Sequence, residues 1–245
     1  MTRSVRLALL LVIVVAAFGV VMAQADDSIA YGDVVEGSLS GSDEVVYTFE
    51  GQEGDVVVVQ VVSAPEDGTY SPEVKILDAR DREVVNSAAL IIFGRIGAMI
   101  GGELAADGEY RVVVSGSEGD FIMALTKPEA LAPGDEIRDE TTSTPEDSTI
   151  FYKNIYLVDS ADDFTLTYEV TDGGFTPTLV VHAFETGGNL FPIAYVGGSD
   201  FISGAVTVAG SRDFRIITVG SLNFGSSGSG DEQRAEFTLK LDLAD

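Results

Sequence analysis

The chain contains an internal repeat, and this repeat constrains its fold more than any other feature. Residues 29–39 read IAYGDVVEGSL, and residues 131–141 read LAPGDEIRDET. Each opening is followed by short apolar segments with strand-like alternation, separated by clusters of Gly, Asp, Asn and Pro. Short strands at near-regular spacing, broken by turn residues, are typical of a β-sandwich or barrel. The repeat therefore predicts an all-β protein with two related domains in tandem.

The predicted first domain covers residues 26–126, the second covers residues 134–245, and a Pro-containing link at 127–133 joins them. The run VVVVQVV at 56–62 is typical of a strand that is buried on both faces or central in a sandwich. The alternation predicts a first core that contains Phe49, Val56, Val58, Val74, Ile76, Tyr110 and Val112. The second core is predicted to contain Leu179 or Val180, together with Phe214, Ile216, Phe237 and Leu239.

The segments of the two copies can be aligned in the same order. DVVVVQVV at 55–62 aligns with DFTLTYEV at 163–170, and EYRVVVSGS at 109–117 aligns with DFRIITVGS at 213–221. The second copy is longer, chiefly through the polar, Gly/Ser-rich stretch at 225–234, which is typical of a flexible hairpin tip.

Residues 88–102, AALIIFGRIGAMIGG, are dense in apolar side chains but contain four glycines, which disfavour a helix. The segment predicts one or two core strands with a bend. The functional alternative is an exposed patch for self-association, although large exposed apolar patches are rare on monomers.

The N-terminus has the pattern of an export signal. Arg3 and Arg6 precede the uncharged apolar run at 7–23, and Ala23 and Ala25 fit a small-x-small cleavage site. We expect a signal peptide over residues 1–25 that is cleaved after Ala25, with cleavage after Ala23 as the second choice. An uncleaved membrane anchor is the alternative, since the run is at the short limit for a bilayer span.

The composition restricts the classes of partner. The formal net charge is −26, which opposes binding to nucleic acid phosphates and to anionic membrane surfaces. The chain has no cysteine, so its domains must fold without disulfides, and domains of about 100 residues can do so. With one histidine as well, the chain lacks the ligands of most zinc sites.

No catalytic constellation stands out in the sequence. The single histidine, His182, lies in the strand-like segment TLVVHA, and no G-x-S-x-G elbow accompanies it. With 40 acidic residues, a carboxylate pair for glycoside hydrolysis carries little information. Calcium is the one cation left open, because it prefers clustered carboxylate and carbonyl oxygens. The candidate clusters are Asp26-Asp27, Asp43-Glu44, Glu66-Asp67 and Asp162-Asp163, although turns also favour Asp.

Several motifs together resemble the bacterial pre-peptidase C-terminal domain. In order along the first copy they are Gly32, Gly37 and Leu39; Tyr47 and Phe49; Gly54 and Asp55; Pro72, Val74, Ile76 and Asp78; Leu104, Gly108, Tyr110 and Val112; Gly119 and Phe121. The second copy departs from this pattern where Arg138-Asp139 replaces Glu36-Gly37 and where Asp213 stands near the turn glycine. The resemblance implies jelly-roll-like antiparallel β-sandwiches that are generally non-catalytic, some relatives of which bind calcium or extracellular polymers.

We therefore expect an exported, non-catalytic binding or structural module, secreted, periplasmic or at the cell surface. Its expected partner is an extracellular polysaccharide, an envelope component or a protein, with no nucleic acid and no membrane after cleavage. The alternatives are a subunit of a surface assembly and a carboxylate-dependent hydrolase. No catalytic, cofactor-binding or metal-binding residue is assigned. The loops at 184–192 and 225–234 are the expected binding loops, because surface loops on a rigid scaffold often carry binding.

Overall fold

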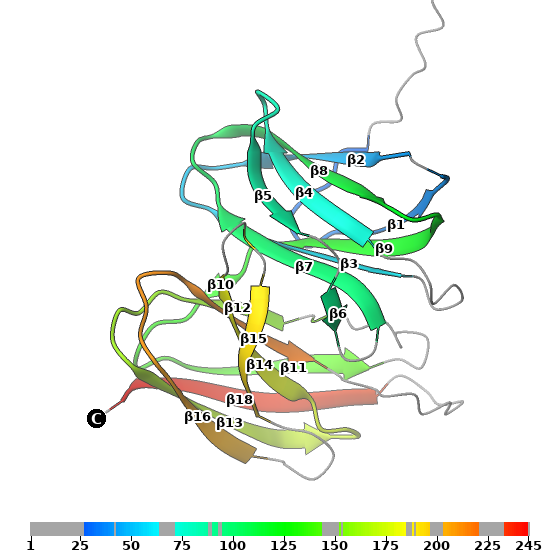
Figure 1. Cartoon of the computed structure of the whole chain (residues 1–245). Coiled ribbons are helices and arrows are strands. Elements are labelled where there is room, and N and C mark those ends of the chain that lie inside the picture. The colour runs from blue at the N-terminus through cyan, green and yellow to red at the C-terminus, as the bar shows by residue number, and fades with distance from the viewer. Residues whose placement is uncertain are drawn as a thin grey trace, which may run out of the picture.

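The structure of the chain is a computed structural model that describes residues 27–41, 43–63, 72–87, 90–92, 95–143, 152, 154–184, 188, 190–196, 203–220 and 233–244. Every regular element in these residues is a β-strand, and the strands form four sheets (Figure 1). The sheets make two sandwich-like domains, so the prediction of an all-β, two-sandwich protein is confirmed. The signal peptide lies outside the described residues, and a jelly-roll topology stays a prediction.

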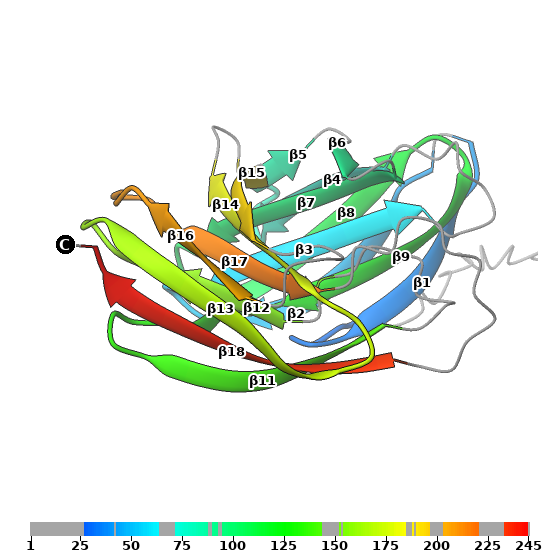
Figure 2. The same cartoon turned by 90° about the horizontal axis from the view of Figure 1, so that it is seen from below.

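The four sheets stack as layers, with the two inner sheets face to face (Figures 1 and 2). In domain 1 the outer sheet has the order β2 (Val45–Gly51), β8 (Gly108–Gly116), β4 (Pro72–Asp78), β5 (Glu83–Ser87). Its inner sheet has the order β1 (Val34–Leu39), β9 (Gly119–Thr126), β3 (Val56–Ser63), β7 (Arg95–Glu103), β6 (Leu90–Ile92). In domain 2 the inner sheet has the order β10 (Glu129–Ala130), β12 (Asn154–Val158), β17 (Arg215–Gly220), β14 (Thr178–Phe184), β15 (Leu190–Val196). Its outer sheet has the order β11 (Glu136–Ser143), β18 (Gln233–Leu243), β13 (Phe164–Gly173), β16 (Ser203–Val208).

The two copies of the repeat open with the same turn and the same hydrogen bonds. Gly32 and Gly134 have φ values of 95° and 96°, a region that glycine enters without steric cost. The N–H of each donates to a carbonyl of the last long strand of its own domain, at 2.8 and 2.7 Å. The following Asp33 and Asp135 each accept the N–H three residues upstream at 2.8 Å. Both domains therefore close with the same turn, which joins their first and last strands.

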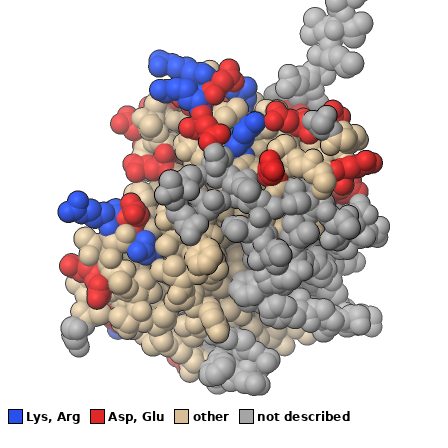
Figure 3. All heavy atoms as spheres, in the orientation of Figure 1, with Lys and Arg blue, Asp and Glu red and all other residues tan. Residues whose placement is uncertain are grey.

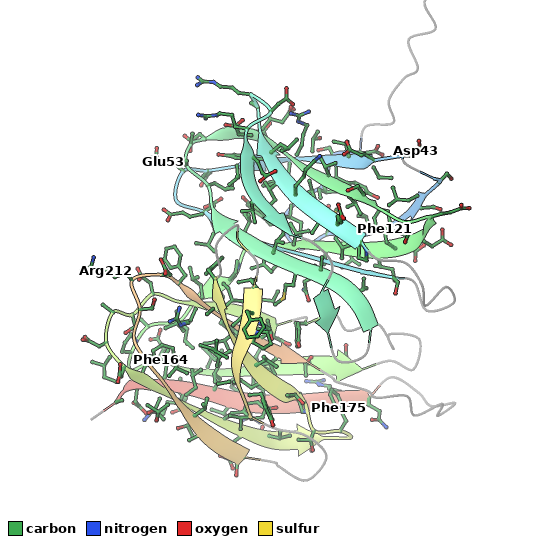
Figure 4. All side chains as sticks on the ribbon, viewed as in Figure 1. Asp43, Glu53, Phe121, Phe164, Phe175 and Arg212 are labelled. Atoms are coloured by element: carbon green, nitrogen blue, oxygen red, sulfur yellow. The ribbon has the colours of Figure 1, made fainter. Side chains whose placement is uncertain are left out.

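Each domain has its own hydrophobic core between its two sheets. Phe121 and Phe164 are fully buried in the first and second core respectively (Figure 4). The predicted core positions Phe49, Val74, Ile76, Tyr110 and Val112 are confirmed in the first core. Leu179, Phe237 and Leu239 are confirmed in the second.

Four predicted core residues, together with Val180, which was predicted only as the alternative to Leu179, lie elsewhere, in a third cluster between the two domains. Val56, Val58, Val180 and Ile216 are buried members of this cluster, and Phe214 packs against it. The prediction for Val56 and Val58 is wrong because β3 is buried on both faces. Its odd-numbered valines face the first core, whereas Val56, Val58 and Gln60 face domain 2.

The ambiguous segment at 88–102 contains strands β6 and β7, and no helix is present in its described part. Met99 packs between the domains and Ile100 packs in the first core, so the described middle of β7 is not an exposed patch. Within the predicted link at 127–133, β10 pairs in parallel with β12, and Leu131 is buried in the second core.

Candidate functional site

The interface between the domains is an extensive buried surface. The outward face of β3 and Met99 of β7 pack on β12, β14, β15 and β17 of domain 2. The buried members of this interdomain cluster are Val56, Val58, Met99, Tyr152, Ile155, Val180, Leu190 and Ile216. Because burial of apolar surface is favourable at roughly 25 cal/mol per Å², the cluster holds the two sandwiches in one arrangement.

Gln60 is the polar centre of this interface on the side of domain 1. Its Nε2 donates to the carbonyl of Tyr152 at 3.1 Å, and its Oε1 accepts the N–H of Tyr152 at 3.0 Å. The side chain thus satisfies a buried peptide of domain 2 as a neighbouring strand would. A second direct bond joins the N–H of Gly101 to the carbonyl of Gly188 at 2.9 Å.

His182 lies on the opposite side of the interface, in domain 2. The side chain is 2% exposed, and its Nε2 is 2.9 Å from Oγ1 of Thr218. Its ring meets that of Tyr152 edge to face at 5.8 Å. Burial lowers the pKa of His182 to about 3 and raises the pKa of Tyr152. A histidine with that pKa is neutral near pH 7 and is poorly matched to general acid–base catalysis there.

Several of the described carboxylates take part in turns, ion pairs or hydrogen bonds to neighbouring side chains. Asp163 accepts the N–H of Gly210 at 2.9 Å, and Asp43 stands in an exposed turn after β1 (Figure 4). Asp55 is the one buried carboxylate among the described residues, and it accepts hydrogen bonds from Lys127 Nζ at 2.6 Å, the Tyr31 hydroxyl at 3.0 Å and the N–H of Gln52 at 3.2 Å. Burial raises the pKa of Asp55, but the hydrogen bonds from these three groups together with the charge of Lys127 outweigh it, so the pKa lies below its ordinary value.

Among the described residues, no group of three or more Asp, Glu, His or Cys side chains could hold a metal ion. Asp26, Glu66 and Asp67 of the candidate calcium clusters lie outside the described residues. In the part of the chain that the structure describes, no helix is long and apolar enough to cross a membrane.

The edge strand β15 exposes an apolar strip that the sequence reasoning did not identify. Phe191, Ile193 and Tyr195 are 48%, 46% and 73% exposed, and we call these three residues the β15 strip. In Figure 3 the charged side chains gather over domain 1 and at one margin of domain 2, whereas the visible surface over β15 is uncharged. The apolar run LFPIAYV after a glycine pair was the available signal, although a buried strand has the same composition.

A β-bulge places the β15 strip on both sides of the sheet edge. The pairing with β14 shifts between Ala194 and Pro192, so Ile193 is the extra residue. Phe191 is opposite Ala183, on the side of the second core, whereas Tyr195 is opposite Val180, on the side of the interface. Phe191 and Tyr195 therefore lie on opposite sides of β15, which is the last strand of the inner sheet among the described residues.

The predicted binding loops are only partly described. In the loop at 184–192, Phe184 and Leu190 belong to the interdomain cluster and Gly188 bonds to β7, so these positions serve domain contact. Residues 225–232 of the second loop lie outside the described residues.

No protein-family model and no curated protein matches the chain. Among solved structures, the pre-peptidase C-terminal domain of a collagenase from Bacillus anthracis matches with 17% identity and a TM-score of 0.32, over 40% of this chain and 92% of that one. A protein from Eubacterium rectale described as secreted has 13% identity and a TM-score of 0.30, over 86% of this chain and 74% of its own. The M60 catalytic domain with two CBM51 domains of ZmpB from Clostridium perfringens has 11% identity and a TM-score of 0.27, over 87% of this chain and 34% of its own. The family that the sequence resembles is thus present among the structural matches.

Proposed function

We propose that the chain is an exported, non-catalytic module that attaches through the β15 strip to a protein of the cell envelope or the extracellular space. The observation that carries the proposal is the strip itself: three large apolar side chains on one edge strand, on an uncharged part of a chain with a net charge of −26. Exposed apolar patches of this kind mark interaction sites.

The placement of the strip favours a protein over a polysaccharide. A sugar chain stacks on aromatic rings that share one flat face, whereas Phe191 and Tyr195 point to opposite sides of the sheet edge. An extended polypeptide segment has side chains that alternate between two faces, so it can pack on both rings at once. The strip also continues from Leu190, which is buried in the interface between the two domains of this chain.

The strand limits how a partner can pair with it. Pro192 has no N–H, and the bulge at Ile193 interrupts the regular ladder, both of which are common on edge strands that avoid uncontrolled association. We therefore expect the partner to make mainly side-chain contacts with the strip, with little backbone pairing.

The test compares the triple variant Phe191→Ser, Ile193→Ser, Tyr195→Ser with the control Val34→Ser, Leu243→Ser, which removes exposed apolar side chains elsewhere. Binding is measured on envelope preparations of the producing cell, intact and after proteinase treatment. We expect the strip variant to bind at least tenfold more weakly, the control to bind normally, and proteinase to abolish binding. Binding that survives proteinase, or that the strip variant retains, would contradict the proposal.

Two further measurements separate the alternatives. Sedimentation of the exported protein alone would reveal a surface assembly of identical copies if the protein associates through the strip. Turnover on peptide and glycan panels that one carboxylate substitution abolishes would indicate a hydrolase. For the export step, N-terminal sequencing should read Asp-Asp-Ser-Ile from Asp26, and a mature chain that retains Arg3 would indicate a membrane anchor.

A further inference from the structure

The only histidine of the chain is buried where the two domains meet. His182 lies on β14, and its side chain is directed toward the face that Gln60 and Tyr152 cover from the other side. Its Nε2 is bonded to Thr218, and its Nδ1 has no hydrogen-bond partner among the described residues. The ring is therefore held as a neutral imidazole in a largely apolar contact.

No carboxylate among the described residues of the surrounding strands pairs with the imidazole ring of His182. Besides Tyr152, the neighbours in the interface are Val56, Val58 and Gln60 on β3, Met99 on β7, Pro192 on β15, and Ile216 and Thr218 on β17. None of these can supply a carboxylate. The charged residues of β7 are Arg95 and Glu103, the first and last of that strand. The charged residue of β17 is Arg215, a cation that begins the strand and pairs with Ala183. Lys153 and Glu185, which are close in sequence to Tyr152 and Phe184, lie outside the described residues.

We propose that the interface between the inner sheets is an acid-sensitive latch, in which protonation of His182 separates the two domains while each sandwich stays folded. Separation without unfolding is feasible because the first and second cores form between the sheets of each domain and share no residue with the interdomain cluster. Opening would expose the apolar faces of β3 and β14 to solvent or to a partner.

The physical reason is the solvation of the imidazolium. A charged ring needs water or acceptors at both nitrogens, whereas in the closed interface Nε2 is bonded to the Thr218 hydroxyl and Nδ1 has no hydrogen-bond partner among the described residues. The pKa of His182 is about 3 when closed, against an ordinary value of about 6.5 once the ring reaches water. Because the open form binds the proton more tightly, the ratio of open to closed protein at pH 5 is about 30-fold higher than for the deprotonated protein. At pH 7.5 the ratio is almost unchanged.

The absence of native cysteine permits a direct test with single introduced thiols. Val58 and Val59 are adjacent on β3 and both 0% exposed, but Val58 faces domain 2 and Val59 faces the first core. Labelling of Val58→Cys and Val59→Cys by 4,4′-dithiodipyridine is followed from pH 7.5 to pH 4.5, with each rate divided by that of a small thiol. We expect Val58→Cys labelling to rise about 30-fold by pH 5 while Val59→Cys stays protected.

The role of the histidine is tested by repeating Val58→Cys in His182→Gln and His182→Leu backgrounds, of which the first keeps a polar side chain and the second an apolar one. Neither replacement titrates, so the acid response should shrink to less than threefold. If a cysteine at Val58 weakens the interface by itself, Val180→Cys and Val181→Cys form the equivalent pair on β14. Parallel labelling of the interface and core positions would overturn the latch, and so would an unchanged acid response without His182.

Discussion

Strands β3 and β13 hold the same place in their domains but face different surroundings. Val59 of β3 is opposite Leu125, and Leu166 of β13 is opposite Leu241, which are equivalent positions in the last strands. β3 is buried along its whole length, whereas β13 alternates between buried and accessible residues up to Glu169. The fold is thus shared, and the outward face of the strand decides which surface meets the other domain.

For the other sheet of each domain the contrast is reversed: the outward face is polar in domain 1 and apolar in domain 2. Arg111 on β8 and Lys75 on β4 form ion pairs on the outer sheet of domain 1. The equivalent positions in domain 2 are Ile216 and Val180, both buried in the interdomain cluster. Each domain therefore has one apolar outward face and one polar outward face, on non-equivalent sheets.

This arrangement is a head-to-tail stack of two units, because the two domains meet through non-equivalent sheets. The inner sheet of domain 1 is matched by the inner sheet of domain 2, and both outer sheets carry charged side chains such as Lys75 and Arg138. Repeat proteins likewise need polar outer faces on their terminal units to stay soluble. The difference between the copies therefore lets the two domains pack through their apolar outward faces and leaves the charged faces on the outer sheets.

The largest effect should follow from giving β3 the polarity of β13. Val58→Asp buries an unpaired charge in the interface and should lower the free energy of unfolding by about 3–5 kcal/mol. Thr165→Asp changes the equivalent position of β13, which is partly accessible, and should cost less than about 1 kcal/mol. Urea unfolding measures both, and equal losses would mean that the two faces do not differ in energy.

The next largest effect should come from the bond that joins the domains. Gln60→Ala leaves the N–H and carbonyl of Tyr152 buried without their partner and should cost about 2–4 kcal/mol. The control is Thr167→Ala at the equivalent, exposed position of β13, for which we expect a change within about 0.5 kcal/mol. A neutral Gln60→Ala variant would show that water replaces the side chain in the interface.

The pH dependence of stability should reveal the histidine that only domain 2 contains. The pKa of His182 is about 3 in the folded state and ordinarily about 6.5, so the unfolded chain binds the extra proton. Stability is therefore full above pH 6.5 and falls as the pH drops toward 3, by about 2 kcal/mol at pH 5. The comparison of wild type with His182→Gln at pH 7.5 and pH 5 removes the contribution of the carboxylates. Identical pH dependence in the two proteins would refute this assignment.

The smallest effect on stability should come from Gly37 of β1, whose equivalent in β11 is Asp139. A Cβ on Gly37 would lie 2.3 Å from the ring of Phe121, so Gly37→Ala should cost about 1.5 kcal/mol by overpacking. Domain 2 carries Asp139 at this position, where it accepts the Tyr156 hydroxyl at 2.7 Å. The exposed neighbour Ser38→Ala is the control in thermal unfolding. A stable Gly37→Ala variant would mean that Phe121 moves easily.

Much of the fold was predictable because its signals are local. The turn at Gly32-Asp33 recurs at Gly134-Asp135, and each requires a left-handed glycine next to a carboxylate that bonds backward within the turn. The alternation of β2, β4 and β9 likewise identifies their core faces, since side chains of a strand point to opposite sides in turn.

The register between the copies was not predictable. The sequence alignment makes Val58 equivalent to Leu166 and Arg111 equivalent to Arg215. The strand pairing instead makes Val59 equivalent to Leu166 and Arg111 equivalent to Ile216. A slip of one residue moves every side chain to the other face of its strand. Apolar residues on both faces of β3 gave no means of detecting that slip.

The sequence by itself therefore determined the all-β class, the duplication and the residues that close each sandwich, because these depend on neighbours a few residues apart. The tertiary structure alone decided which apolar face is core and which is interface, since that depends on contacts such as Gln60 with Tyr152, 92 residues apart. It also decided that the apolar run of β15 forms an edge strand of the described inner sheet, because the same residues in a central strand would have neighbouring strands on both sides.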